Sequence, residues 1–200
     1  LIVGSGEYAL PDLIETLDHK KEPVAVANVY SKKGASIKTN TLETIINLDK
    51  LPFPDFSQFD LDLYLNPRRA LPLQDARGCS WRKCAFCNYT RKYFDAYSTF
   101  SIDRFIQTIK YLKDTYNCRY FLLHNDDLPP SRARKICSAI IKHKIKNIFI
   151  NTYARLVDGF NDDLLRLMRK AGFCSIRWGL ESGSQKVLDL MNKGINIHTA

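Results

Sequence analysis

Apolar and polar residues follow two alternating patterns along the last two thirds of the chain. Short apolar runs of strand-like composition lie at 70–76, 119–125, 147–154 and 174–182. Each is followed by a segment whose apolar residues recur at helical spacing, at 101–116, 130–144, 161–172 and 184–194. Periods of two and of about 3.6 residues are typical of strands and amphipathic helices. The pattern therefore predicts four β–α units in series.

Consecutive β–α units predict an α/β fold with a parallel sheet and right-handed crossovers. Residues with capping chemistry support the helices, because Ser101 precedes one of them and Asn161 and Gly172 bound another. Four such units match an incomplete barrel better than a finished open sheet. In barrels of this kind, functional groups gather in the loops at the carboxyl ends of the strands.

The first third of the chain has a different pattern. Residues 1–7 and 23–31 have the composition of strands, and residues 8–20 that of a short amphipathic helix. We expect residues 1–46 to be the C-terminal part of an α/β domain. Residues 47–69 contain three prolines among acidic and aromatic residues, which predicts an extended linker whose Phe and Leu side chains attach it to a neighbouring surface.

Composition places the chain among globular proteins, with 45% hydrophobic and 26% charged residues. No apolar run approaches the roughly 18 residues of a membrane span. The start has no features of a signal peptide, and we expect the sequence to be a fragment of a longer protein. The net charge is −4 over residues 1–66 and +13 over residues 67–200. Because the basic residues are dispersed along helices, a solvated basic face is favoured over a nucleic-acid site, which stays open.

The six cysteines fall into two groups. Cys118, Cys137 and Cys174 stand alone in apolar surroundings, as small buried residues do. The others form the spacing C-x4-C-x2-C directly after the first strand of the β–α series, at Cys79, Cys84 and Cys87. This usage does not indicate a disulfide scaffold, and it fits a reducing cytoplasm.

Three clustered cysteines limit the kinds of metal site that the loop can form. A structural zinc site needs four Cys or His ligands, and neither residue occurs between Asn88 and Asn117. Three thiolates suit a [4Fe–4S] cluster that leaves one iron open, and an open position at the mouth of a barrel indicates catalysis. The alternative is a zinc knuckle completed by the distant His124 or Cys118.

The segment "CSWRKCAFC" resembles the cluster loop of the radical S-adenosylmethionine (radical SAM) superfamily, in particular of members with an N-terminal cobalamin-binding domain. The usual family spacing is C-x3-C-x2-C with an aromatic residue before the third cysteine. Here Phe86 keeps the aromatic, and the first gap has one additional residue. The "VGSGE" turn at residues 3–7 resembles the last glycine turn of such a cobalamin-binding domain, although the family's His motif would lie upstream of this chain.

This resemblance implies a (β/α)6 partial barrel and a set of residues that contact S-adenosylmethionine (SAM). The second strand of the β–α series ends in "HNDD", where Asp126 matches the position that receives the amino group. The fourth ends in "GLESG", where Glu181 and Ser182 match the positions that contact ribose and carboxylate. Phe86 would meet the adenine, and Arg155 would pair with the carboxylate of SAM.

Each of these assignments has a structural alternative. Asp127, beside Asp126, has the position of an N-cap for the helix that Pro129 and Pro130 would begin. A cap at Ser184 would leave Glu181 near a helix N-terminus. Arg155 could instead form a salt bridge to Asp158 or Asp126. No residue is assigned as a catalytic group.

The function implied by the resemblance is reductive cleavage of SAM to a 5′-deoxyadenosyl radical, using the [4Fe–4S] cluster and an electron donor such as flavodoxin or ferredoxin. Bound cobalamin would make methyl transfer to carbon the expected outcome. The alternatives are a tRNA-modifying methylthiotransferase, whose usual second cysteine cluster has no counterpart in the cysteine-free residues 1–78, and a non-enzymatic zinc or nucleic-acid module. The substrate is not identified by the sequence.

Overall fold

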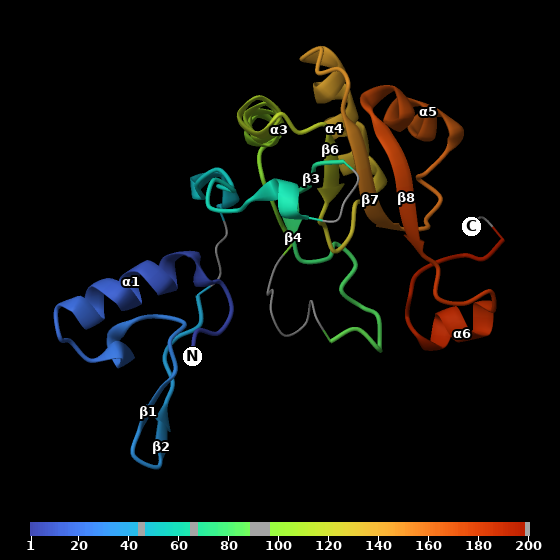
Figure 1. Ribbon diagram of the computed structural model, residues 1–200. Coiled ribbons are helices and arrows are strands. Elements are labelled where there is room, and N and C mark those ends of the chain that lie inside the picture. The colour runs from blue at the N-terminus through green and yellow to red at the C-terminus, as the bar shows by residue number, and fades with distance from the viewer. Residues whose placement is uncertain (44–46, 65–67, 89–96, 199–200) are drawn as a thin grey trace.

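A computed structural model describes residues 1–43, 47–64, 68–88 and 97–198. Its centre is a parallel sheet in the order β3-β6-β7-β8 (Figure 1). The strands are β3 (Ala70–Leu73), β6 (Tyr120–Leu123), β7 (Phe149–Arg155) and β8 (Phe173–Gly179). The predicted series of β–α units and its parallel sheet are confirmed.

Three helices cover one face of this sheet, and a fourth lies past the end of β8 (Figure 1). They are α3 (Ile102–Tyr116), α4 (Pro130–Lys142), α5 (Asp162–Ala171) and α6 (Gln185–Leu190). The helix caps were predictable from the sequence. The Ser101 hydroxyl accepts a hydrogen bond from the Arg104 backbone at 3.1 Å, and Gly172 ends α5 with a φ of 103°.

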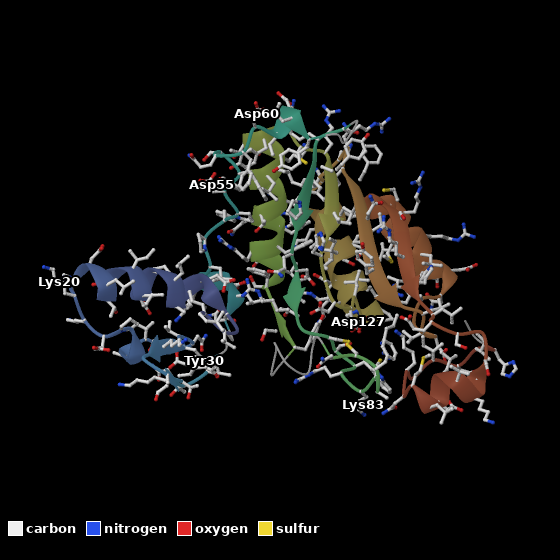
Figure 2. All side chains as sticks on the ribbon, turned by 60° about the horizontal axis from the view of Figure 1, so that its bottom comes forward. Lys20, Tyr30, Asp55, Asp60, Lys83 and Asp127 are labelled. Carbon is white, nitrogen blue, oxygen red and sulfur yellow. The ribbon has the colours of Figure 1, made fainter. Side chains whose placement is uncertain are left out.

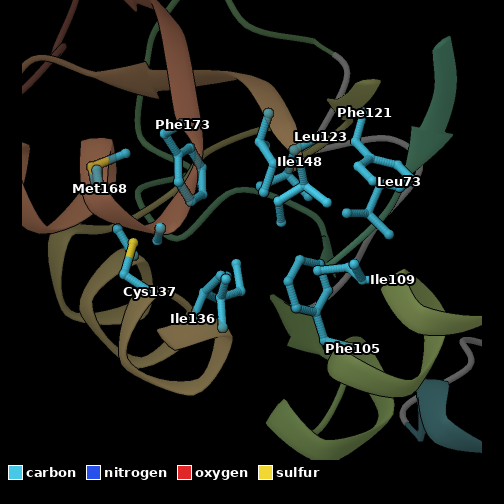
Figure 3. Close-up of a cluster of buried hydrophobic side chains, with 14 of the residues drawn as sticks. Leu73, Phe105, Ile109, Phe121, Leu123, Ile136, Cys137, Ile148, Met168 and Phe173 are labelled. Carbon is cyan, nitrogen blue, oxygen red and sulfur yellow. The ribbon is translucent and has the colours of Figure 1, made fainter. Parts of the chain in front are cut away.

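The hydrophobic core lies between the sheet and helices α3, α4 and α5 (Figure 3). Alternate residues of each strand point into it, because successive side chains of a strand leave opposite faces. The buried strand residues include Leu71, Leu73, Phe121, Leu123, Ile150 and Phe173, and the helices contribute Phe105, Ile109, Ile136, Cys137 and Met168. The opposite face of the sheet is therefore free to present polar side chains.

A short antiparallel ladder, absent from the predicted pattern, closes the loop that carries the clustered cysteines. Strand β4 (Ala76–Arg77) pairs with β5 (Ser98–Thr99). The backbone N–H of Phe100 donates to the carbonyl of Asp75 at 2.9 Å. The two ends of the loop are thus joined directly after β3. Two-residue strands are too short to leave a periodic signal in the sequence.

The N-terminal unit forms a helix, α1 (Gly6–Asp18), and a hairpin of β1 (Ser31–Lys33) and β2 (Ser36–Lys38). The strands expected at 1–7 and 23–31 are wrong. These segments meet in a single antiparallel bridge between Ile2 and Val29, and Pro23–Ala25 form the 3-10 turn η1. Proline at the start of this turn has no N–H to donate to a ladder, which explains why the apolar run does not form a strand.

The linker follows the surface of the sheet domain, as the sequence predicted. Where it is described, at residues 47–64 and 68–69, its regular structure consists of the 3-10 turns η2 (Leu48–Lys50) and η3 (Leu61–Leu63). Phe53 stacks on Tyr111 of α3 with ring centroids 5.0 Å apart, and the Phe56 N–H donates to the hydroxyl of Tyr116 at 2.8 Å. In the described part of the chain, no helix is both long and apolar enough to cross a membrane.

Candidate metal and cofactor site

The cysteine loop lies beyond the carboxyl ends of the strands, between the N-terminal unit and α6 (Figure 1). Figure 2 shows Lys83, within the loop, at the same end of the sheet as Asp127. The loop follows β3 directly in the chain. It therefore lies at the carboxyl edge of the sheet, because all four strands are parallel and end at this edge. The predicted location of the cysteines at the mouth of the sheet agrees with the structure.

The loop is held by the segment that follows α6. The backbone N–H of Ala85 donates to the carbonyl of Met191 at 2.7 Å, and the indole Nε1 of Trp81 donates to the carbonyl of Asn192 at 2.7 Å. Gly194 has a φ of +66°, and a Cβ there would overlap the Trp81 ring. Glycine is therefore required at this position for both its backbone conformation and its lack of a side chain.

None of the three clustered cysteines forms a disulfide, and they differ in exposure. Cys84 is buried, whereas Cys79 and Cys87 are partly exposed. Burial raises the pKa of the Cys84 thiol; the charges of Cys79 and Cys87 act in the same direction, while those of Lys193 and Arg155 oppose them. Each of the other two cysteines is thus near enough to Cys84 to interact electrostatically, and so are two cations.

Across the described ranges, no group of three or more His, Cys, Asp or Glu side chains is placed to hold a metal ion. The donor chemistry nevertheless fits an anionic iron–sulfur cluster, because three thiols share one loop and two cations lie beside it. Assignment of Cys79, Cys84 and Cys87 as ligands stays a prediction.

Asp127 forms a buried junction between the cysteine loop and β7. It is 2% exposed. Its carboxylate accepts a hydrogen bond from the Ser80 hydroxyl at 2.5 Å and lies 3.7 Å from Nε of Arg155. The alternative of an N-cap at Asp127 is wrong, since the N-cap residue of α4 is Pro129. The structure also gives Arg155 a carboxylate partner that the sequence reading did not name.

Arg155 lies where a ligand at the loop would meet it. Its Nη1 donates to the carbonyl of Lys193 at 2.9 Å, and its guanidinium lies 4.6 Å from the centre of the Trp81 ring. The buried Nε makes no hydrogen bond to any described residue. A buried donor of this kind is costly unless a further acceptor satisfies it, so Arg155, although paired with Asp127, can still donate a hydrogen bond to a ligand.

Asp126, the predicted contact for the SAM amino group, lies on the rim of a cavity of about 360 Å³ that Gln74, His124 and Tyr153 also line. Partial burial raises the pKa of Asp126, and a hydrogen bond from the Gly78 backbone opposes that rise. Asp126 nevertheless keeps access to solvent as a residue. Through the bond from Gly78, Asp126 contacts the start of the cysteine loop.

Glu181 is held beside the cysteine loop through a buried lysine. Nζ of Lys193, a residue only 6% exposed, donates to the Glu181 carboxylate at 2.8 Å and lies 5.4 Å from the centre of the Phe86 ring. Glu181 itself has a φ of +69°, a conformation that is uncommon for residues with a side chain and that concentrates at functional sites. The structure thus brings together Glu181 and Phe86, two of the predicted SAM contacts.

The remaining predicted contact, Ser182, is tied to its own turn. Its hydroxyl accepts a hydrogen bond from the Ser184 backbone at 3.1 Å. Ser184 precedes α6 but makes no side-chain cap bond. Ser184 therefore takes the N-cap position of α6, as the structural alternative expected, but without a side-chain bond, and the Glu181 carboxylate is paired with Lys193.

Sequence reasoning missed a buried network behind the loop. The Asp75 carboxylate is fully buried and forms an ion pair with Arg132. The Nε of Arg132 lies 3.0 and 3.1 Å from the two carboxylate oxygens, and its Nη2 donates to the carbonyl of Phe100 at 2.6 Å. Asn125 accepts the backbone N–H of Asp75 at 3.1 Å. A clue was present, because an Asp that directly follows an apolar strand requires a partner when it is buried.

Comparisons with known proteins agree with this arrangement. Residues 73–199 match the family model described as the Radical SAM superfamily. The chain is 24% identical over 200 residues to the uncharacterized methyltransferase PH0819 of Pyrococcus horikoshii, covering 98% of this chain and 43% of that protein. It is 27% identical over 210 residues to the anaerobic magnesium-protoporphyrin IX monomethyl ester cyclase of Rubrivivax gelatinosus, covering 98% of this chain and 37% of the relative.

The fold also has a counterpart among solved structures. The radical SAM methyltransferase TsrM from Kitasatospora setae, solved with tryptophan substrate and the SAM analogue aza-SAM, superposes with a TM-score of 0.69 at 12% identity. The match covers 100% of this chain and 40% of that one. The chain thus spans about two fifths of the length of the proteins that it matches. Because the family model covers most of the sheet domain and its cysteine loop, the chain belongs to the radical SAM superfamily, whose enzymes use a [4Fe–4S] cluster and SAM.

Proposed function

We propose that this chain is the part of a radical SAM enzyme that binds the [4Fe–4S] cluster and SAM, with Cys79, Cys84 and Cys87 as the cluster ligands. The observation that carries the proposal is the position of the three thiols. They lie in one loop beyond the carboxyl ends of a parallel sheet, and Cys79, Cys87, Lys193 and Arg155 are all close enough to act electrostatically on Cys84. When bound, the cluster supplies the electron that cleaves SAM into methionine and a 5′-deoxyadenosyl radical.

The residues of the chain would bind and orient SAM. Asp126 has a carboxylate on the cavity rim that suits the ammonium group, and Arg155 has a buried donor that suits the carboxylate. Glu181 would accept hydrogen bonds from the ribose, together with Ser182, and Phe86 would contact the adenine. Lys193 donates to one oxygen of the Glu181 carboxylate, which leaves the other oxygen to accept a hydrogen bond from the ribose.

For the whole protein we propose methyl transfer, since the relative from Pyrococcus horikoshii is a methyltransferase by name. Residues 1–46 would be the end of a cobalamin-binding-like domain, residues 47–69 its linker and residues 70–200 the first four units of the radical SAM barrel. Cobalamin would then carry the methyl group. A reducing cytoplasm, with flavodoxin or ferredoxin as electron donor, suits six cysteines that form no disulfide.

Anaerobic reconstitution with iron and sulfide tests the cluster assignment. We expect about four irons per chain and a brown, oxygen-labile protein. Cys79→Ala, Cys84→Ala and Cys87→Ala should each lose the intact cluster. Cys137→Ala is the matched control, because this buried thiol lies in the core between α4 and its neighbours.

Two outcomes would overturn the cluster assignment. One is a colourless protein that carries a single zinc after reconstitution. The other is a loss of iron on Cys118→Ala, which would indicate a site with a different set of thiols.

A further inference from the structure

The face of the sheet opposite the helices carries a transverse row of polar side chains at its carboxyl end. In the parallel register, Leu73 pairs with Leu123, and Leu123 with Thr152; these three side chains are buried. The next residue along each strand points to the other face. Those residues are Gln74, His124 and Tyr153, and Tyr153 pairs in turn with Arg177 of β8.

Three members of this row share one cavity. Gln74, His124 and Tyr153 line the space of about 360 Å³ at the mouth of the sheet, with Arg77 and Asp126 at its edge. Arg177 reaches the same group from β8, since its Nη1 donates to the hydroxyl of Tyr153 at 2.9 Å and its guanidinium lies 5.4 Å from the centre of that ring. The row therefore adjoins the loop of the clustered cysteines without belonging to it.

Once SAM is bound, the charge that remains beside the cavity favours a negatively charged ligand group. Arg77 is neutralised by an ion pair with Glu7, and Asp126 would be neutralised by the SAM ammonium group. Arg177 is exposed, and no carboxylate among the described residues pairs with it. A guanidinium has five N–H donors in a planar fork, and one of them is used, by Tyr153. The His124 imidazole has no hydrogen-bond partner within the described ranges.

We propose that Arg177, positioned by Tyr153 and assisted by His124, binds an oxyanion group of the substrate, either a carboxylate or a phosphoryl group. The guanidinium fork matches the two oxygens of such a group, and the imidazole and phenol add hydrogen bonds from the neighbouring strands. The substrate would thus be anionic, with its charged end on β8 and the rest extending across the cavity toward β6. This inference rests on the proposed function of the adjoining site.

Isothermal titration calorimetry of the reconstituted protein with inorganic phosphate and with glutarate tests the proposal. We expect saturable binding of at least one of the two anions, and the preferred one identifies the oxyanion. Arg177→Gln should weaken that binding about tenfold or more, as expected for the loss of a charge-assisted contact. Arg177→Lys keeps the positive charge but lacks the planar fork of donors. Its affinity for the anion should therefore lie between those of the wild type and Arg177→Gln.

The matched control is Arg166→Gln, which removes the same charge from an exposed position on α5 and should leave anion binding unchanged. Absence of saturable binding, or equal affinities of wild type and Arg177→Gln, would overturn the proposal. Iron content and SAM cleavage of the wild type, measured on the same preparation, separate this failure from failure of the proposed function. A reconstituted protein without iron would refute the proposed function, whether or not an anion binds.

Discussion

The ion pair between Asp75 and Arg132 gives the sharpest prediction about the stability of the chain. The side chain of Asp75 is 0% exposed and that of Arg132 12%. Arg132→Met would remove the cation and keep most of the side-chain volume, leaving a buried carboxylate without its counter-charge. Breaking a buried pair in this way costs about 3–5 kcal/mol of unfolding free energy. For a chain of this size, that loss lowers the melting temperature by roughly 6–20 °C.

A double-mutant cycle that adds Asp75→Asn measures the coupling free energy between Asp75 and Arg132, apart from the contacts of each residue with its surroundings. Burial raises the pKa of Asp75, against the opposing effect of Arg132 and Asn125, so Asp75→Asn in the Arg132→Met background relieves the desolvation of the charge. We therefore expect the double variant to be more stable than the sum of the two single losses predicts, by about 1–3 kcal/mol. Urea unfolding followed by circular dichroism measures all four proteins.

A local measurement connects this pair to the cysteine loop. Arg132 also holds the carbonyl of Phe100 at 2.6 Å, where the loop returns to the sheet. Hydrogen exchange at the Phe100 and Thr99 amides should therefore accelerate in Arg132→Met more than exchange at Ile150 in β7. A loss of stability below about 1 kcal/mol, or single losses that simply add, would refute the reasoning that the pair is a coupled, buried clamp.

Three further predictions concern the loop and its neighbours. Glu181→Ala should weaken SAM binding about 10- to 150-fold at unchanged iron content, since it removes a charge-assisted hydrogen bond; SAM titration followed by paramagnetic resonance of the cluster checks this, and unaltered affinity would return Glu181 to a structural role. Gly194→Ala should cost more unfolding free energy than the control Gly34→Ala, because both have positive φ but only Gly194 faces the Trp81 ring; equal losses in urea would disprove the steric argument. Burial raises the pKa of Glu7, but the hydrogen bond and charge of Arg77, together with backbone N–H groups at the start of α1, lower it below its ordinary value. This ion pair therefore stabilises above the ordinary pKa of Glu7, and the contribution is lost as the pH falls through the lowered value. Glu7→Gln should speed tryptic cleavage of the linker at pH 7 by up to about fivefold, the equivalent of roughly 1 kcal/mol, and an unchanged rate would contradict a role for the pair.

The sheet domain was predictable because its elements are long and its caps are chemical signals. Helix α3 begins after Ser101, as expected, and α5 ends at Gly172. The N-terminal unit was harder to predict, since the apolar residues of 23–31 support both a strand and the observed turn with its single bridge. Only the tertiary environment decides between them.

The candidate site also contains residues that the sequence could predict and residues that it could not. Cys79, Cys84 and Cys87 could be selected because their spacing is local. The partner of Glu181, by contrast, is Lys193, which enters the site from beyond α6. Its burial depends on how that segment folds back against Phe86. No local pattern distinguishes such a lysine from the many solvated ones, so the sequence could not show it.

The attachment of the cysteine loop to the segment after α6 has a consequence for the order of folding. The bond between Ala85 and Met191 joins residues more than a hundred positions apart, as does the bond between Trp81 and Asn192. Contacts of such high sequence separation form late, because the chain between them must first be ordered. During synthesis, the thiols therefore leave the ribosome well before the surface that fixes their loop. Metal loading should accordingly follow docking of α6, and until then the reduced cysteines depend on the cell for protection from oxidation.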